Sequence, residues 1–332
     1  MPPAPSAGNA ATRREHSTPG DRPRPRIAVT LGDPRGIGPE VTGRALQDES
    51  LRHAADFVVV GPTGTLVPAA DTVGMWQANG GAANAGKLAG AAIERAVSLA
   101  LAGDVDGVVT APIDKAALLS GGYDFPGHTE MLAALTGADT VMMLASDRLR
   151  VVLATTHVPL RDVPRLLTAD VIAKTAAITR SGLIDWFGLA SPRIALCALN
   201  PHAGDGGRFG TEDIDVLAPA ARTAGLSGPF PADTVFVRAL RGEFDAVIAP
   251  YHDVGMTAIK VASFGSAVNV TLGLPFPRTS PDHGTAIDIA GKGIADASSM
   301  IHAMRVCVEI VNTRKATGHR PQATGHRLGD IP

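Results

Sequence analysis

Aromatic side chains and net charge are both scarce in this sequence. Aromatic residues make up 4% of the 332 residues, and the formal net charge is −2 at pH 7. Proteins that bind nucleic acids stack bases on aromatic side chains and attract phosphates with basic surfaces, so we expect no nucleic acid partner. No apolar run approaches the roughly 20 residues that a membrane-spanning helix needs. We therefore expect a soluble protein with no membrane partner.

Cysteine is also rare. The two cysteines, Cys197 and Cys307, are far apart in the chain and show no spacing typical of a metal site. Structural disulfides are uncommon in proteins of the reducing cytosol, where free cysteines behave as small apolar residues. We interpret both as reduced thiols in the core of a cytoplasmic protein.

Both ends of the chain lack the apolar periodicity of folded segments. Residues 1–25 are rich in Pro, Ala, Gly, Ser and Arg and contain no apolar stretch of the kind that export requires, so we expect a disordered leader. Residues 315–332 contain the pentapeptide ATGHR twice, and we expect a disordered tail. His16, His319 and His326 are therefore not expected to belong to a site.

Between these ends, short apolar runs alternate with helix-like segments. Hydrophobic residues make up 45% of the sequence, which is enough for a large core. Strand-like runs lie at 26–31, 56–61, 106–112, 140–145, 150–157, 192–200 and 244–250. Helix-like segments lie at about 39–51, 85–102, 168–187, 214–223 and 287–312, whereas 62–84 shows no clear periodicity. This alternation predicts an α/β fold with a mostly parallel, doubly wound sheet and flanking helices.

The first strand-like run leads into a glycine-rich loop, GDPRGIGPE. The loop resembles a phosphate-binding turn but matches neither GxGxxG nor GxxxxGK[ST], so we favour a tight turn that uses Gly36 and Gly38. We interpret Asp33 as a surface acid and Glu40 as a first-turn helix residue, where a negative charge favours the helix dipole. Neither is assigned any chemistry.

Three histidines each follow a strand-like run by a few residues. His157, His202 and His252 would gather at the carboxyl edge of a parallel sheet, or across an interface between two such edges. A single histidine in such a place is more often structural, but three in the same topological position favour a site. Three neutral imidazoles with an open fourth position are typical of zinc, or of another divalent ion such as cobalt.

A second group of polar residues could bind an anion. His128 and Thr129 follow Pro-Gly, Lys260 follows the His252 loop, and Asn269 and Arg278 flank the turn NVTLGLPFP. Lys260 and Arg278 taken singly could be solvated surface residues. Lys260, however, stands within the apolar run MTAIKVA, and burial there would suit it to general acid or base catalysis.

Seven motifs between about Arg26 and Asn312 resemble those of the 4-hydroxythreonine-4-phosphate dehydrogenase family of pyridoxal phosphate biosynthesis. In order, they are VTLGDPRGIGPE, FPGHTE, ATTHVPLRD, LNPHAGDGGRFGTE, GPFPADT, YHDVGM and VNVTLGLPFPRTSPDHGTA. Any one of them alone is weak evidence. Their occurrence together in the family's order is highly specific.

The resemblance implies an enzyme that oxidises 4-phosphooxy-L-threonine with NAD or NADP and a divalent metal, zinc, magnesium or cobalt. The product would be a β-keto acid that loses CO₂ to give 3-amino-2-oxopropyl phosphate. By position in the motifs, the metal ligands would be His157, His202 and His252, and the substrate contacts would be His128, Thr129, Lys260, Asn269 and Arg278. Lys260 is our candidate for proton transfer, and Asp233 lies at a family active-site position without an assigned role. The family's homodimer draws its metal ligands from both subunits.

The segment HGTAIDIAGKGIA, residues 283–295, is similar to the adenosine-binding segment of isopropylmalate and isocitrate dehydrogenases. The resemblance implies a related two-domain fold and explains the missing GxGxxG motif. Cofactor contacts would come from His283, Gly284 and Asp288. A carboxylate at Asp288 would accept hydrogen bonds from a ribose 2′-hydroxyl and repel a 2′-phosphate, which favours NAD. Alternatively, Asp288 only begins the last helix.

The implied first domain comprises residues 26–122 and 284–314, and the second comprises residues 123–283. Some features depart from the family pattern: residues 62–84 form a short region, Val254 replaces a frequent Gln, and prolines flank Arg278. Because the motifs hardly separate the two, a related enzyme for a four-carbon sugar-acid phosphate, threonate or erythronate 4-phosphate, is an alternative. A protein that binds metal or phosphate without catalysis is a third.

Overall fold

The computed structural model describes residues 24–263 and 266–318. The predicted leader lies outside these residues except for Arg24 and Pro25. His16, His319 and His326 also lie outside them.

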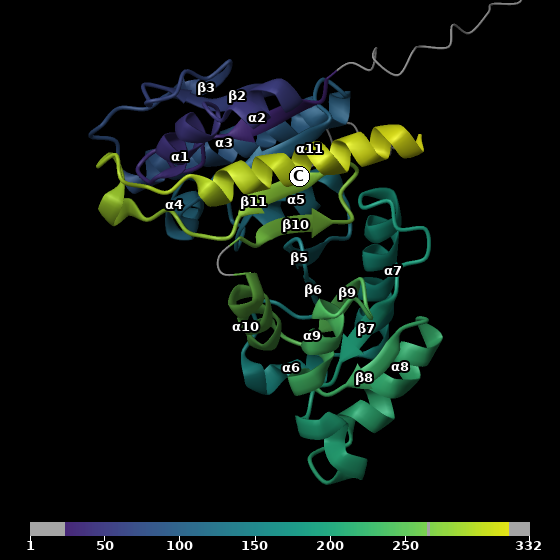
Figure 1. The fold of residues 1–332 in the computed structure, drawn as a ribbon. Helices are drawn as coiled ribbons and strands as arrows, with labels where there is room; N and C mark the ends of the chain where they lie inside the picture. The colour runs from purple at the N-terminus through teal and green to yellow at the C-terminus, as the bar shows by residue number, and fades with distance from the viewer. Residues whose placement is uncertain (1–23, 264–265, 319–332) are drawn as a thin grey trace, which may run out of the picture.

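The strands of the described residues form one eleven-stranded sheet in the order β3-β2-β1-β4-β11-β10-β5-β6-β9-β7-β8 (Figure 1). Their bounds are β1 Arg26–Thr30, β2 Asp56–Thr63, β3 Asp71–Met75, β4 Gly107–Thr110, β5 Val141–Ala145, β6 Arg150–Leu153, β7 Ile194–Cys197, β8 Ser227–Phe230, β9 Ala246–Ala249, β10 Val268–Leu272 and β11 Arg278–Pro281. Pairing is parallel toward both ends of the sheet and antiparallel in the middle, between β11 and β10, β10 and β5, and β5 and β6. The predicted α/β fold with a mostly parallel sheet is confirmed.

Helices flank this sheet along the described chain. They are α1 Gly38–Ala45, α2 Glu49–Ala54, α3 Ala82–Ala102, α4 Lys115–Ser120, α5 His128–Thr136, α6 Val163–Leu166, α7 Ala169–Asp185, α8 Ala218–Thr223, α9 Ala232–Leu240, α10 His252–Ser263 and α11 Ser298–Thr317. Short turns of other helix types are η1 Leu160–Asp162, η2 Pro201–Gly207, the π-helical turn η3 Asp213–Leu217 and η4 Ile287–Ile289. The strands β4 and β9 are buried along their whole length, as expected for apolar strands covered on both faces.

Two predicted helices have different bounds in the structure. The helix expected at 39–51 is split because the side chain of Asp48 accepts a hydrogen bond from Leu51 N and caps a new helix, α2. The helix expected at 287–312 begins only at Ser298, after Gly291 and Gly293 adopt φ of 72° and 69°.

The final helix also changes the predicted tail, because α11 continues to Thr317. Residues 315–317 of the expected disordered tail 315–332 are therefore helical, and that boundary was placed too early. The region 62–84, which lacks sequence periodicity, contains the edge strand β3 and the first turn of α3.

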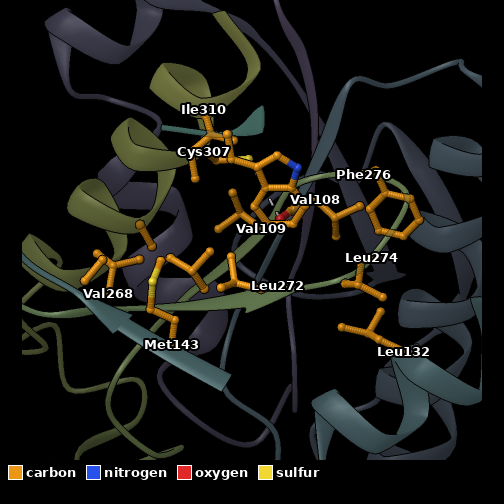
Figure 2. Packing of buried hydrophobic residues seen from close by; sticks show 14 of the residues in the cluster. Val108, Val109, Leu132, Met143, Val268, Leu272, Leu274, Phe276, Cys307 and Ile310 are labelled. Carbon is orange, nitrogen blue, oxygen red and sulfur yellow. Dashed lines mark hydrogen bonds between the residues drawn. The ribbon is translucent and has the colours of Figure 1, made fainter. Parts of the chain in front are cut away.

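One apolar cluster runs through the middle of the sheet. Figure 2 shows Val108 and Val109 of β4, Met143 of β5 and Val268 of β10 near Cys307 of α11. Helix α11 crosses the upper part of Figure 1 and contacts β4, β11 and β10. The cluster therefore joins residues of both predicted domains, and the division at 122/123 and 283/284 stays a prediction. Both cysteines are buried and free, as expected for core thiols.

Candidate functional site

The structure brings His157 and His252 together at one edge of the sheet. Strands β6 and β9 are parallel neighbours that pair Leu153 with Ala249, so the residues that follow them leave the sheet at the same edge. His157 lies four residues beyond Leu153, and His252 begins α10. The centroids of the two imidazole rings lie 5.7 Å apart.

Each of these imidazoles has a carboxylate nearby. His252 Nδ1 lies 2.7 Å from Asp253 Oδ1, and His157 Nδ1 lies 3.9 Å from Glu130 Oε1. Burial lowers the pKa of His157 below 6.5, and the positive charge of Lys115 lowers it further. A neutral imidazole whose Nδ1 faces a carboxylate leaves Nε2 free as a metal ligand.

His202 does not join this pair within its own chain. In residues 24–263 and 266–318, no three His, Cys, Asp or Glu side chains are arranged to hold a metal ion. His202 is exposed in η2, and its ring centroid lies 6.4 Å from that of Phe209. Of the two arrangements that the sequence left open, convergence of all three histidines within one chain is wrong.

Arg278 is fully buried on β11, although the sequence allowed a solvated surface position. The side chain is 1% exposed, and it donates to Thr271 Oγ1 at 2.9 Å and to Thr110 Oγ1 at 2.6 Å. Burial lowers its pKa from 12.5 to about 9, against the opposing negative charge of Glu130. Among the described residues, no carboxylate forms an ion pair with Arg278, and its Nε has no hydrogen-bond partner.

Two other predicted anion-binding residues also carry buried polar atoms without partners in the described part of the chain. These atoms are His128 Nε2, at the start of α5, and Asn269 Oδ1, on β10. Burial holds the pKa of His128 well below 6.5, and the charges of Arg278 and Lys115 lower it further. Buried polar groups are normally hydrogen-bonded, so unpaired atoms on α5, β10 and β11 are typical of a place for a polar ligand. Thr129 follows His128 in α5 and is partly buried.

Lys260 is not buried, so the expectation that its apolar neighbours would enclose it is wrong. Its side chain is 52% exposed, and Nζ lies 3.2 Å from Asp282 Oδ2. Helix α10 buries the adjacent Ile259 instead, because successive residues of a helix face different directions. The ion pair connects α10 to the segment that follows β11.

The predicted cofactor segment contacts the first glycine-rich loop. Ile37 N donates to Thr285 O at 2.9 Å, and a Cβ at Gly36 would lie 2.7 Å from the same oxygen. His283 Nδ1 lies 3.0 Å from Gly284 O, and its buried Nε2 has no partner in the described residues. The exposed Asp288 lies in η4. The alternative that Asp288 begins the last helix is wrong.

The two acidic residues of the first loop are buried, which corrects the interpretation of Asp33 as a surface acid. Asp33 is 1% exposed, and its Oδ2 lies 2.6 Å from Arg35 Nη2. Glu40 is 8% exposed, and its Oε1 accepts a hydrogen bond from Ala295 N at 3.1 Å. Both carboxylates therefore hold the loops beside the predicted cofactor segment.

Sequence patterns assigned no role to Lys115 or Glu130, although both charges act on the histidines of this edge. Lys115 lies five residues beyond the end of β4, so the carboxyl-edge rule used for the histidines could have identified it. Asp233, a predicted catalytic residue, is exposed in the first turn of α9.

The chain matches a family model described as pyridoxal phosphate biosynthetic protein PdxA over residues 44–307. A 4-hydroxythreonine-4-phosphate dehydrogenase of Ruegeria sp. (strain TM1040) is 45% identical over 320 residues, which covers 87% of this chain and 98% of that protein. A crystal structure of the Klebsiella pneumoniae 4-hydroxythreonine-4-phosphate dehydrogenase is 38% identical, with a TM-score of 0.78, and covers 88% of this chain and 99% of that one.

A terephthalate 1,2-cis-dihydrodiol dehydrogenase from Burkholderia xenovorans LB400 is more distant. It is 28% identical, with a TM-score of 0.62, and covers 86% of this chain and 98% of that one. In the described residues, no helix combines the length and apolar character needed to cross a membrane.

Proposed function

The chain belongs to the PdxA family of pyridoxal phosphate biosynthetic proteins, and we propose that it oxidises 4-phosphooxy-L-threonine with NAD(P) and a divalent metal. The observation that carries this proposal is the buried guanidinium of Arg278, which two threonine hydroxyls orient and which forms no ion pair with a carboxylate in the described residues. A buried charge without a counter-ion is costly and is retained where a ligand supplies the opposite charge. A substrate with phosphate and carboxylate groups has that charge.

The residues beside Arg278 fit the same substrate. His128 is held neutral and presents a buried Nε2, which can accept a hydrogen bond from a hydroxyl or an ammonium group, or donate one in its other tautomer. Asn269 Oδ1 can accept one from the amino group of the substrate. Thr129 adds a hydroxyl on the next position of α5. We assign these residues to orienting the substrate.

His157 and His252 fit a divalent metal such as zinc, magnesium or cobalt, because both imidazoles have a carboxylate near Nδ1. When bound, such an ion would make the substrate hydroxyl more acidic, and NAD(P) would accept the hydride. Since His202 does not reach the pair in its own chain, we propose that His202 of a second copy supplies the third ligand in a homodimer. Two metal sites would then be shared between two subunits.

In the proposed reaction, the carbinol carbon would give a hydride to NAD(P), the hydroxyl gives its proton to water, and a ketone forms beside the carboxylate-bearing carbon. The bond to the carboxylate then breaks, CO₂ leaves, and the resulting enolate takes up a proton to give 3-amino-2-oxopropyl phosphate. We assign this proton transfer to Lys260, whose half-exposed ammonium can exchange protons with water while Asp282 holds it in place. Asp233 remains a candidate catalytic residue without a defined step.

We assign cofactor binding to the segment that contains His283, Gly284 and Asp288. It packs against the first glycine-rich loop, and the buried Nε2 of His283 has no partner in the described chain. The exposed carboxylate of Asp288 would repel a 2′-phosphate, which favours NAD over NADP. The two buried free thiols support a cytoplasmic location.

A mixing experiment tests the shared metal site. His202→Ala and His252→Ala are each expected to be inactive, because each homodimer lacks a ligand at both sites. In a refolded equimolar mixture, half of the dimers combine the two variants, and each of those has one intact site. We therefore expect recovery of about one quarter of the wild-type rate of NAD reduction. No recovery from folded, dimeric variants would contradict the shared site.

Parallel turnover assays test the substrate. The proposal predicts faster reduction of NAD with 4-phosphooxy-L-threonine than with threonate or erythronate 4-phosphate. A preference for a sugar-acid phosphate would move the assignment to the related dehydrogenases without changing the site. Absence of turnover with all three would favour a protein that binds metal or phosphate without catalysis.

A further inference from the structure

The loop that carries His202 has an unusual backbone. His202, Ala203 and Asp205 adopt φ of 52°, 55° and 43°, the left-handed region that L side chains rarely occupy. A run of such residues persists only where surrounding contacts impose it, and such runs are concentrated at functional sites.

The buried carboxylate of Asp213 anchors the start of this loop. Asp213 is 1% exposed, its Oδ1 accepts a hydrogen bond from Leu199 N at 2.8 Å, and its Oδ2 accepts one from Asn200 N at 2.9 Å. These donors belong to the two residues before Pro201. Both carboxyl oxygens are therefore occupied by backbone N–H groups at the start of the loop.

Two further features reinforce this anchor. The side chain of Asn200 donates to Glu212 Oε2 at 2.8 Å, which adds a second link between the start of the loop and the residue before Asp213. Asp213 begins the π-helical turn η3, a rare irregularity that is frequent at functional sites. The entrance of the loop is therefore held by three hydrogen bonds.

The loop nevertheless presents an imidazole that nothing described in its own chain binds. His202 is exposed, and the nearest aromatic ring is that of Phe209, which is 50% exposed. A strained loop whose start is held by hydrogen bonds and which exposes a histidine is suited to presenting that histidine to another chain. We propose that Asp213 is a positioning residue that holds His202 in the conformation in which it enters the metal site of a second copy.

This inference rests on the shared metal site proposed above, and its first test is metal binding. Asp213→Asn keeps the shape of the side chain but turns an NH₂ group toward a backbone N–H. We expect the affinity for Co²⁺, measured by the absorption of the bound ion, to fall roughly tenfold to a hundredfold. Asp215→Asn makes the same charge change at an exposed position of η3, and its affinity should remain that of the wild type. Equal affinities for both variants would overturn the proposal.

The mixing experiment distinguishes positioning from a general structural role. In the His202→Ala and His252→Ala pair, the intact site takes His202 only from the His252→Ala chain. Asp213→Asn placed on that chain should abolish the recovery, whereas the same substitution on the His202→Ala chain should leave it unchanged. Equal loss in both arrangements, or loss in neither, would overturn the positioning role.

Asn200→Ala is a milder second variant, because it removes the bond to Glu212 and leaves Asp213 in place. It should reduce the recovery when placed on the His252→Ala chain but not when placed on the His202→Ala chain. An equal reduction on either chain would count against the proposal. If the parent pair recovers nothing, the shared site itself is wrong, and the inference falls with it. If the parent pair recovers activity but the effect of Asp213→Asn does not depend on which chain carries it, the positioning role of Asp213 is wrong and the shared site stands.

Discussion

Replacing Arg278 by methionine should stabilise the folded protein while removing its affinity for anions. Methionine is similar in length and apolar, and it fits a position that is 1% exposed. The guanidinium it replaces has only two threonine hydroxyls as hydrogen-bond partners among the described residues. The guanidinium forms no ion pair in the described residues, so removal of its charge costs only the longer-range attraction of Glu130.

The magnitude follows from the pKa. Burial lowers the pKa of Arg278 from 12.5 to about 9. At about 1.4 kcal/mol per unit, folding with the charged side chain costs roughly 5 kcal/mol. Loss of hydrogen bonds to Thr271 and Thr110 offsets about 2 kcal/mol of the gain. The free energy of unfolding should therefore rise by on the order of 3 kcal/mol in Arg278→Met.

Urea denaturation with and without inorganic phosphate measures both effects. Phosphate should raise the denaturation midpoint of the wild-type protein and leave that of Arg278→Met unchanged, because only a ligand that binds the folded state stabilises it. Arg305→Met, at an exposed position of α11, is the matched control and should alter the free energy of unfolding by less than about 0.5 kcal/mol.

A large loss of stability would refute this reasoning. Breaking a buried ion pair destabilises a protein by about 3–5 kcal/mol. A loss of that size in Arg278→Met would mean that the guanidinium already has a counter-charge within the protein. Continued stabilisation of the variant by phosphate would place the anion site elsewhere.

Acidification should destabilise the protein through His128: its pKa is well below 6.5 in the folded state, so below about pH 6.5 the unfolded chain takes up a proton that the folded chain does not. The stability contribution of His128 is then complete above that pH and declines as the pH is lowered. Urea midpoints should therefore fall less steeply on acidification in His128→Asn than in the wild-type protein, and an equal dependence on pH in both would contradict this. Asp253→Asn removes the carboxylate 2.7 Å from His252 Nδ1 and should weaken Co²⁺ binding roughly tenfold in a titration, and an unchanged affinity would count against that role. Gly86→Ala, usually favourable in a helix, should destabilise by about 1–3 kcal/mol in urea denaturation, because its Cβ would lie 1.8 Å from a backbone oxygen of α4; a more stable variant would refute the predicted clash.

The sequence predicted the fold and one pair of site residues because both depend on local pattern plus one topological rule. Apolar runs mark the strands, and parallel neighbours deliver their following residues to the same edge, so His157 and His252 meet. The same rule is insufficient for His202. Its strand β7 is also a neighbour of β9, but His202 lies five residues beyond the end of β7 and joins no group of three metal-ligating side chains in the described part of the chain.

Burial of the charged residues could not be predicted from their neighbours in the chain. An apolar run surrounds Lys260, yet the helix directs it outward and Ile259 inward. Arg278 is buried because Thr110 and Thr271, on two other strands, lie beside it. Contacts between residues so distant in sequence form only when the sheet packs. The same holds for the burial of Asp33 and for the position of Lys115 near His128.

The strand order has a consequence for how the chain folds as it leaves the ribosome. Strands β10 and β11 are made late, yet they fill the gap between β4 and β5 in the middle of the sheet. Until Val268–Pro281 has been synthesised, the growing chain has two unpaired strand edges that can pair with other chains. Completion of the sheet is therefore a late event, and nascent chains halted before Val268 should be the ones that aggregate and engage chaperones.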